Sequence, residues 1–326
     1  MTEIYKIKAG IIGAAGYTGG ELIRILLNHP KVTIDFCYSR SQNGKFVSDI
    51  HTDLCGDTEL VFTNEINTNI DVLFLCLPHG EAKQFLEKNS FSPTAKIIDL
   101  SNDFRLKNNA NDFIYGLPEL NKNKIKSSKH TANPGCFATA IQLALLPLAN
   151  QNLLQSDIHI SAITGSTGAG ILQNEATHFT WRNNNLSVYK AFTHQHLGEI
   201  GESITQMQHS FHQAINFIPY RGNFTRGIIA TIYTDFTGTL TEAKTIFNNY
   251  YKDDYFVFIS DKNIDVKQVV NTNKCLLYLE KHDNKLMIIA VIDNLIKGAS
   301  GQAVQNMNLM FGFNENEGLK LKSVAY

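Results

Sequence analysis

A glycine-rich turn close to the N-terminus constrains the fold of this chain more than any other feature of the sequence. Residues 4–12 form an apolar run typical of a strand, the turn GAAGYTGG follows at 13–20, and apolar side chains then recur at helical spacing from Leu22 to Leu27. A strand, a tight glycine turn and a helix in this order form the first half of a βαβ unit. The N-terminal part of the chain is therefore expected to build a sheet of parallel strands.

The segments that follow continue this pattern and then change it. Three further strand candidates, with helical stretches between some of them, lie at 32–38, 71–77 and 95–100. After about residue 156, longer strand candidates rich in β-branched residues lie at 158–164, 226–234, 274–280 and 285–293. Helical patterns remain at 199–213, 241–251 and 298–313. We therefore predict an α/β protein with a doubly wound parallel sheet and a second, α+β domain with a mixed or antiparallel sheet.

Composition and charge exclude several classes of protein. The 326 residues carry a net charge of −1 without a dense Lys/Arg run, so nothing favours binding to nucleic acid or to a membrane surface. No apolar stretch approaches the roughly 18 residues that a transmembrane helix needs. The N-terminus lacks the apolar core of a signal peptide, and the five cysteines form an odd set without a CxxC pair. We expect a cytoplasmic protein with reduced thiols.

The glycine turn predicts a nucleotide site. Gly13, Gly16 and Gly19 leave room for a pyrophosphate to approach the backbone at the helix N-terminus. The residues that would meet the adenosine ribose read Tyr38-Ser39-Arg40-Ser41, with Lys45 close by. Hydroxyl groups and cations suit a 2′-phosphate, so NADP is favoured over NAD. Asp35 keeps the alternative open, because a carboxylate that reached the ribose would favour NAD.

Cys136 is the candidate nucleophile. The sequence NPGC (133–136) precedes an Ala/Leu-rich helical pattern, and a thiol at a helix N-terminus meets N–H groups and a dipole that favour the thiolate. Cys37, Cys76 and Cys275 lie in strand-like runs and are interpreted as buried apolar residues, and Cys55 as an inert loop residue.

The segment HQHLGEI (194–200) supplies the candidate acid/base. Histidine suits proton transfer near neutral pH, and Glu199 is placed to orient an imidazole of His194 or His196. The sequence shows no further ligands that would make this pair a metal site. The other histidines, with His178 less certain, are interpreted as surface or capping residues: 29, 51, 79, 130, 209, 212 and 282.

Seven segments, in the same order, resemble the N-acyl-gamma-glutamyl-phosphate reductases, relatives of the aspartate-semialdehyde and glyceraldehyde-3-phosphate dehydrogenases. They are GAAGYTGGELIRIL, DLSNDFRL (99–106), YGLPEL (115–120), NPGCFATA (133–140), GSTGAG (165–170), HQHLGEI and DNLIKGASGQAVQNMNLMFG (293–312). Any one of them could occur by chance, whereas seven in order make the match specific.

The resemblance implies a Rossmann domain, 1–135 with 299–326, and a catalytic and oligomerisation domain, 136–298. It also implies NADPH-dependent reduction of an acyl phosphate to an aldehyde through a thioester on Cys136, with His196 or alternatively His194 as acid/base, in arginine biosynthesis. A homo-oligomer, dimer or tetramer, is expected. The implied cofactor-binding residues are Gly13, Ala15, Gly16, Tyr17, Thr18, Gly19, Ser39, Arg40, Ser41, Ser166, Gly168 and Asn294. The implied substrate-binding residues are Arg105, for the phosphate, and Asn133, Glu199 and Lys297.

The sequence departs from the family pattern at two motifs. The usual NPGCYPTA reads NPGCFATA, and the usual HRHxPEI reads HQHLGEI, with Gln195 in place of arginine. The second change puts in doubt a role of this position in binding a substrate carboxylate, and the choice between an acetyl and a succinyl group stays open. Three other functions also stay open: reduction of another acyl phosphate such as aspartyl phosphate, an acyl transferase or thioesterase without redox chemistry, and a silent nucleotide-binding module.

Overall fold

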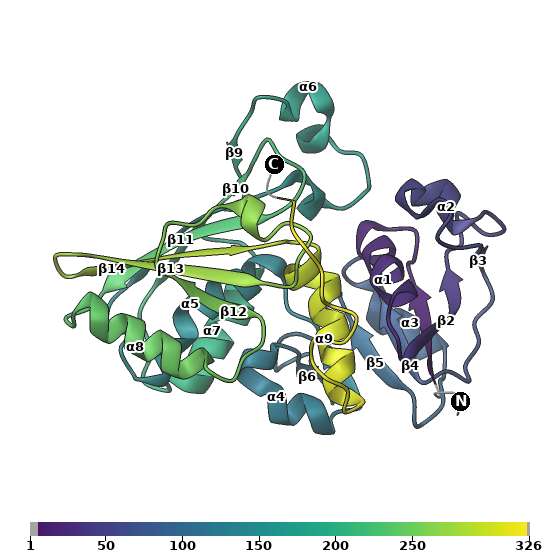
Figure 1. Ribbon diagram of the computed structural model, residues 1–326, viewed down its shortest axis with the longest axis horizontal. Coiled ribbons are helices and arrows are strands. Elements are labelled where there is room, and N and C mark those ends of the chain that lie inside the picture. Colours follow the sequence, from purple (N-terminus) through teal and green to yellow (C-terminus); the bar gives the residue numbers. More distant parts are fainter. Residues whose placement is uncertain (1–5, 325–326) are drawn as a thin grey trace. The chain divides into compact units, whose positions relative to one another are not determined.

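The computed structural model describes residues 6–324 (Figure 1). Contacts along the chain divide it into two compact units. The first holds the residues up to Pro134 together with Ala299–Lys320, and the second holds Gly135–Gly298 together with the residues after Lys320. The functional assignment of two domains, 1–135 with 299–326 and 136–298, stays a prediction. Residues 4 and 5 of the expected first strand, and 325 and 326, lie outside the described residues.

The first unit contains a sheet of seven strands, all paired in parallel, in the order β3-β2-β1-β4-β5-β7-β6. These strands are β1 (Ile7–Ile12), β2 (Val32–Tyr38), β3 (Phe62–Thr63), β4 (Val72–Leu75), β5 (Lys96–Asp99), β6 (Ile114–Tyr115) and β7 (His130–Ala132). The helices are α1 (Tyr17–Leu27), α2 (Val47–Ile50), η1 (Thr52–Leu54), α3 (Glu81–Lys88), α4 (Pro118–Ser127) and α9 (Gly301–Met310). The strand order reverses between β1 and β4, where doubly wound sheets bind their ligands.

The second unit contains a mixed sheet in the order β12-β13-β14-β11-β8-β10-β9. Its strands are β8 (Ile158–Thr164), β9 (Ser187–Val188), β10 (Ile215–Arg221), β11 (Ile228–Asp235), β12 (Val257–Ser260), β13 (Cys275–His282) and β14 (Lys285–Ile292). The α-helices are α5 (Cys136–Asn150), α6 (Phe179–Arg182), α7 (His196–Met207) and α8 (Leu240–Tyr251). Short turns of helix are η2 (Ser166–Ala169), η3 (Glu175–Thr177), η4 (Val266–Gln268) and η5 (Ile296–Ser300).

Helix α5 is the centre of the second unit. Every residue from 137 to 149 is buried, because the Ala/Leu-rich helix packs against α7 and α8 and against β11 and β14. Figure 1 shows these helices together below the sheet. Since a fully buried helix cannot shift without opening the core, the position of its first residue, Cys136, is fixed by packing.

The predicted fold class is confirmed, since a parallel α/β sheet and a mixed sheet with helices are both present. The predicted helix over 199–213 is wrong at both ends, because α7 begins at His196 and ends at Met207. Gln208 ends the helix by bonding with its side chain to both the N–H and the carbonyl of Leu154. The last helical pattern is also shorter than 298–313, with the π-helical turn η5 leading into α9.

Two further features differ from the sequence predictions. Strand β10 is missing from them; it contains Pro219, which is tolerated because β9 pairs only with the last two residues of β10 and leaves the rest as an edge. Of the two interpretations of His29, surface or capping residue, the surface one is wrong, and Nδ1 of His29 accepts the N–H of Lys31 just after α1. His29 is 2% exposed, and its Nε2 lies 3.1 Å from Oδ1 of Asn308 on α9.

Candidate active site

Cys136 is the first residue of α5, where the helix follows Gly135 in an extended conformation. Within α5, all of which is described, no side chain caps the N-terminus and the first turn has no acidic residue. The thiol is half-buried, whereas the rest of the helix lies in the core. Unpaired N–H groups and the helix dipole at this position favour a thiolate. Cys37 and Cys275, in contrast, are buried in strands, and burial raises the pKa of Cys37 to about 12.

Two glycines make room around this thiol. A Cβ atom on Gly298 would lie 2.8 Å from Cβ of Cys136, and a Cβ atom on Gly135 would lie 2.2 Å from Nε2 of His196. Both distances are shorter than real contacts allow. The imidazole of His196 therefore packs directly on the backbone of Gly135, next to Cys136.

The first turn of α7 faces the beginning of α5. Glu199 accepts a hydrogen bond from the N–H of Gly135 at 2.9 Å through Oε2, and its Oε1 lies 3.9 Å from Nε2 of His196. Both side chains are less than a tenth exposed. One buried carboxylate thus holds the residue before Cys136 and faces the imidazole of His196.

His194 lies beside His196, and the centres of the two rings are 4.5 Å apart. Its Nδ1 accepts a hydrogen bond from the backbone N–H of His196 at 3.2 Å, so the proton of the neutral ring is on Nε2. Burial, and after it the positive charge of Lys190, lower the pKa of His194 to about 4. At neutral pH His194 is therefore uncharged.

Sequence reasoning missed the side chains on the other side of His194. The Tyr189 ring lies 5.8 Å from the His194 ring, and the Arg221 guanidinium stacks on Tyr189 at 4.7 Å. Burial raises the pKa of Tyr189; of the charges near it, Arg221 lowers this pKa and Cys136 raises it. The one available signal was a cation directly after an apolar strand candidate, in the sequence FIPYRG.

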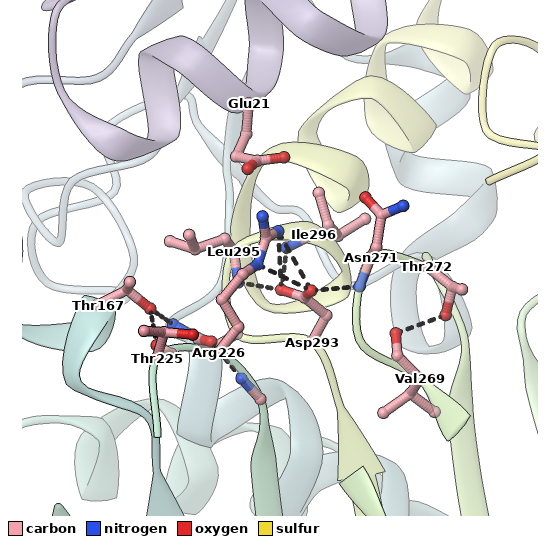
Figure 2. Close-up of polar contacts among 12 residues, drawn as sticks. Glu21, Thr167, Thr225, Arg226, Val269, Asn271, Thr272, Asp293, Leu295 and Ile296 are labelled. Atoms are coloured by element: carbon pink, nitrogen blue, oxygen red, sulfur yellow. Dashed lines mark hydrogen bonds and ion pairs between the residues drawn. The ribbon is translucent and has the colours of Figure 1, made fainter. Parts of the chain in front are cut away.

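A carboxylate with no solvent exposure organises the loop that follows β14 (Figure 2). Asp293 accepts hydrogen bonds from the backbone N–H groups of Leu295, Ile296 and Asn271, at 2.8, 3.1 and 2.6 Å. It also pairs with the guanidinium of Arg226 at 3.1 Å. These bonds fix the backbone that leads to Gly298. They thereby also fix the position of Gly298, which packs against Cys136.

The predicted cofactor residue Asn294 and the predicted substrate residue Lys297 both belong to this segment of the chain. Asn294 accepts from the N–H of Gly227 at 2.7 Å and donates to Thr167 at 3.0 Å, so its amide joins the loop to the turn that contains Ser166 and Gly168. Lys297 has no solvent exposure, and its Nζ lies 5.8 Å from the Phe256 ring.

The glycine turn lies in the first unit, between β1 and α1. Gly13 has φ +76°, and a Cβ there would lie 2.4 Å from the carbonyl oxygen of Cys76. A Cβ on Gly19 would lie 2.6 Å from Cα of Ala14, so only glycine allows α1 to approach β1 this closely. The N-terminus of α1 has no side-chain cap and no acidic residue in its first turn. Ala15, Tyr17 and Thr18 belong to this turn, which fits a pyrophosphate.

Arg105 and Asn133, predicted to bind substrate, also lie in the first unit. Arg105 is 7% exposed, donates to the carbonyl of Leu100 at 2.8 Å and lowers the pKa of Asp99, which burial raises to about 6. Asn133 donates to the carbonyl of Ala299 and accepts from Asn306, both at 3.1 Å. These bonds hold both side chains in place within the first unit, and their binding of substrate stays a prediction.

Among residues 6–324, no group of three or more His, Cys, Asp and Glu side chains is arranged to hold a metal ion. In the same range, no helix has the length and apolar character needed to cross a membrane.

Comparisons with known proteins agree with this arrangement. Residues 8–128 match the family model of the semialdehyde dehydrogenase NAD binding domain, and 136–294 match the model of its dimerisation domain. Aspartate semialdehyde dehydrogenase II from Vibrio cholerae has the same fold, with a TM-score of 0.74 at 16% identity, covering 94% of this chain and 98% of that one. Fold and matches together place the chain in the class of semialdehyde dehydrogenases.

Two relatives define the family more narrowly. N-acetyl-gamma-glutamyl-phosphate reductase of Christiangramia forsetii is 60% identical over 317 residues, 97% of this chain and 99% of the relative. The protein of that name from Bacteroides fragilis is 57% identical over 321 residues, 98% of this chain and all of the relative. The chain therefore belongs to the N-acetyl-gamma-glutamyl-phosphate reductase family.

Proposed function

We propose that this chain reduces an N-acyl-gamma-glutamyl phosphate to N-acyl-glutamate semialdehyde and phosphate, with NADPH as hydride donor, in arginine biosynthesis. The observation that carries the proposal is the grouping of Cys136, His196 and Glu199 at the N-terminus of a buried helix, in a chain about 60% identical to reductases of that name. The fold alone would also suit an aspartate semialdehyde dehydrogenase, to which the chain is only 16% identical.

The side chains divide the chemistry between them. Cys136 thiolate attacks the gamma-carbonyl carbon, the bond to the phosphate oxygen breaks, and a thioester results. When bound, NADPH supplies the hydride that reduces this thioester. His196 donates a proton to the oxygen of the resulting thiohemiacetal and takes it back as the carbon–sulfur bond breaks, which releases the aldehyde and restores the thiolate. The N–H groups at the start of α5 are placed to stabilise the oxyanion.

The assignment of the proton to His196 rather than His194 is supported by their surroundings. His194 is neutral at neutral pH and already accepts the N–H of His196, so its Nδ1 cannot take up a substrate proton. His196 faces Glu199, whose negative charge stabilises an imidazolium. Glu199 is therefore proposed as an orienting residue, and the substrate contact that the resemblance implied for it stays a prediction.

The choice of NADP over NAD is supported by the end of β2. Ser39, Arg40 and Ser41 follow the strand directly, and the side chains of Arg40 and Ser41 are exposed. Asp35, the residue that would favour NAD, lies in the middle of the strand and accepts a hydrogen bond from Asn67 at 2.8 Å. A 2′-phosphate would thus meet hydroxyls and a guanidinium rather than a carboxylate.

A homo-oligomer, dimer or tetramer, is also proposed. The second unit contains the match to the dimerisation domain, and large apolar side chains are exposed along one stretch of it. They are Ile171, Leu172, Phe179, Trp181, Leu186, Val188 and Phe192. A contact between copies would remove this apolar surface from water.

The function is tested in the reverse direction, by the rate of NADP reduction with N-acyl-glutamate semialdehyde and phosphate. The proposal expects a phosphate-dependent rate that far exceeds the rate with aspartate semialdehyde, and an Arg40→Leu variant that weakens NADPH binding more than NADH binding. A preference for aspartate semialdehyde would contradict the proposed substrate, and equal effects on both cofactors would contradict the proposed 2′-phosphate site.

A further inference from the structure

Arg221 is a buried cation beside the active site to which the proposed function gives no role. It is the last residue of β10 and is 9% exposed. Its Nη1 is 3.4 Å from the carbonyl oxygen of Ser166, a weak hydrogen bond to the turn after β8. In the part of the chain that the structure describes, no carboxylate lies within ion-pair distance of its guanidinium. A buried charge with so little compensation is costly unless an anion is bound during function.

Neighbouring elements hold this guanidinium in one orientation. Its face stacks on the Tyr189 ring at 4.7 Å, and stacking leaves the N–H edge of the group available for in-plane hydrogen bonds. Arg182 donates to the carbonyl of Arg221 at 2.7 Å and so fixes the end of β10. The remaining bonds of Arg182 go to the carbonyls of Ala176 and Asn185 and to the hydroxyl of Ser187. Arg182 is thus a support for Arg221 and offers no second cation to a ligand.

The same contacts connect Arg221 to the reacting groups within the second unit. Tyr189 lies between Arg221 and His194, and the His194 ring is 4.5 Å from the ring of His196, which packs on Gly135. A substrate whose carbonyl carbon reaches Cys136 would therefore extend past the two histidines towards Arg221.

A carboxylate matches this site better than a phosphate does. One guanidinium with a free in-plane edge pairs with the two oxygens of a single carboxylate, and the charges cancel. A phosphate carries up to two charges and three acceptor oxygens, and its sites usually gather several donors. Here the second arginine is occupied by carbonyls, and Lys190 donates to Gln195 at 3.1 Å.

We propose that Arg221 binds a carboxylate of the substrate and thereby determines which acyl phosphates this enzyme accepts. The proposal rests on the proposed function for the identity of the substrate. Two carboxylates could fill the site, the alpha-carboxylate of the glutamyl group or a carboxylate at the end of a dicarboxylic acyl group. Both have the same chemistry, and the experiment separates them.

The first test is binding, which does not depend on turnover. The probes are N-acetylglutamine and N-succinylglutamine, in which a neutral amide replaces the acyl phosphate, and their affinities are measured by calorimetry for the wild type, Arg221→Met and Arg221→Lys. Loss of a charge-assisted hydrogen-bond pair should weaken binding by about 10- to 100-fold in Arg221→Met, with partial recovery in Arg221→Lys. If Arg221→Met binds both probes more weakly, the bound group is the alpha-carboxylate. If it binds only the succinyl probe more weakly, the bound group is the acyl carboxylate.

A matched control removes a nearby charge without removing the proposed contact. Lys190 is exposed, and its positive charge lowers the pKa of His194 as that of Arg221 does. If Arg221 acts through direct contact with the probe and not through the long-range effect of its charge, Lys190→Met should change the affinity for either probe by no more than about twofold. Thermal unfolding of each variant shows that it is folded. Unchanged affinity for both probes in folded Arg221→Met would overturn the proposal.

The second test uses the reaction itself, in which semialdehyde and phosphate are separate substrates. Arg221→Met should raise the KM for the semialdehyde by a similar factor and leave the KM for phosphate and NADP nearly unchanged. A raised KM for phosphate alone would assign Arg221 to the phosphate and overturn the carboxylate proposal. If the wild type turned over none of these semialdehydes, the proposed function would fail, whereas the binding result would still decide for or against Arg221.

Discussion

Gly135 and Gly298 determine how closely the reacting groups approach one another. Their missing side chains allow His196 to pack on the backbone next to Cys136 and the loop after β14 to pack on Cys136 itself. Neither glycine has a positive φ, so the space around it, and not backbone conformation, is what requires glycine at both positions.

Gly135→Ala should therefore lower kcat by about 100-fold or more, because the added methyl group would displace the His196 imidazole by the order of an ångström. Gly201→Ala in α7 is the matched control, since a Cβ there has no neighbour within 4 Å and alanine is the better helix former. Steady-state assays that measure kcat for Gly135→Ala and Gly201→Ala test this prediction. Equal activities of the two would show that His196 does not need this position.

His194 makes a contribution to stability that depends on pH. Its folded-state pKa of about 4 is below the ordinary value of 6.5, so the unfolded chain binds the proton more readily. The stabilising contribution is therefore complete above pH 6.5 and is lost as the pH falls towards 4. The groups that act on it are Lys190 and Arg221, which lower the pKa, and Glu199, which raises it.

The expected result is that the wild type loses more stability than His194→Asn when the pH is lowered from about 7 to about 5. Asp99 titrates in the same pH range, but because its pKa is raised to about 6 it changes the stability in the opposite direction. Asp99 is present in both proteins, so its effect cancels when the stability losses of the wild type and His194→Asn are compared. Urea unfolding at both pH values measures this difference. Parallel losses in the two proteins would mean that His194 is not held neutral.

At the scale of elements, the loop between β14 and η5 depends on one buried carboxylate. Asp293 accepts the N–H groups of Leu295 and Ile296, and it joins this loop to other segments by accepting the N–H of Asn271 and pairing with Arg226 (Figure 2). A loop held in this way is rigid without being part of a helix or strand.

Asp293→Asn should destabilise the fold by about 3–5 kcal/mol, since it removes the buried negative charge that pairs with Arg226 and that accepts three backbone N–H groups. Asp235→Asn is the control, because the ion pair of Asp235 with Lys285 is exposed at the far end of the sheet and should matter little. Chemical unfolding of both variants provides the comparison. A stability of Asp293→Asn similar to that of the control would contradict the structural role of this loop.

Sequence patterns predicted the elements that depend on interactions between residues close together in the sequence. The glycine turn, the Cys136 helix and the HQHLGEI segment could be recognised because backbone sterics, helix spacing and residue chemistry act within a few residues. The C-terminal end of α7 could not be predicted in this way, because Gln208 ends that helix through bonds to Leu154, which is distant in sequence.

The parts of the site that sequence reasoning missed come from distant segments. Tyr189 follows β9 and Arg221 ends β10, and only the antiparallel pairing of these two strands brings them together. Asp293 and Arg226 likewise meet because β11 and β14 pair. No local pattern records such pairings, and Pro219 argued against the strand that makes the first of them.

For the whole molecule, the two units carry complementary parts of the proposed reaction. The first has the glycine turn at the β1–β4 switch point of a parallel sheet, and the second has the nucleophile, the histidines and Arg221. The chain connects them at Pro134–Gly135, directly before the nucleophile, and again at Gly298–Ala299, directly after the glycine that packs on it. The central claim is that a covalent intermediate forms on Cys136 between the two chemical steps.

The most direct test is a rapid-mixing experiment with N-acyl-glutamate semialdehyde and NADP in the absence of phosphate. We expect a burst of about one NADPH per active site, followed by slow turnover, because oxidation forms the thioester and only phosphate releases it quickly. Cys136→Ser should bind NADP and give no burst. A burst of equal size in Cys136→Ser, or fast turnover of the wild type without phosphate, would contradict the account.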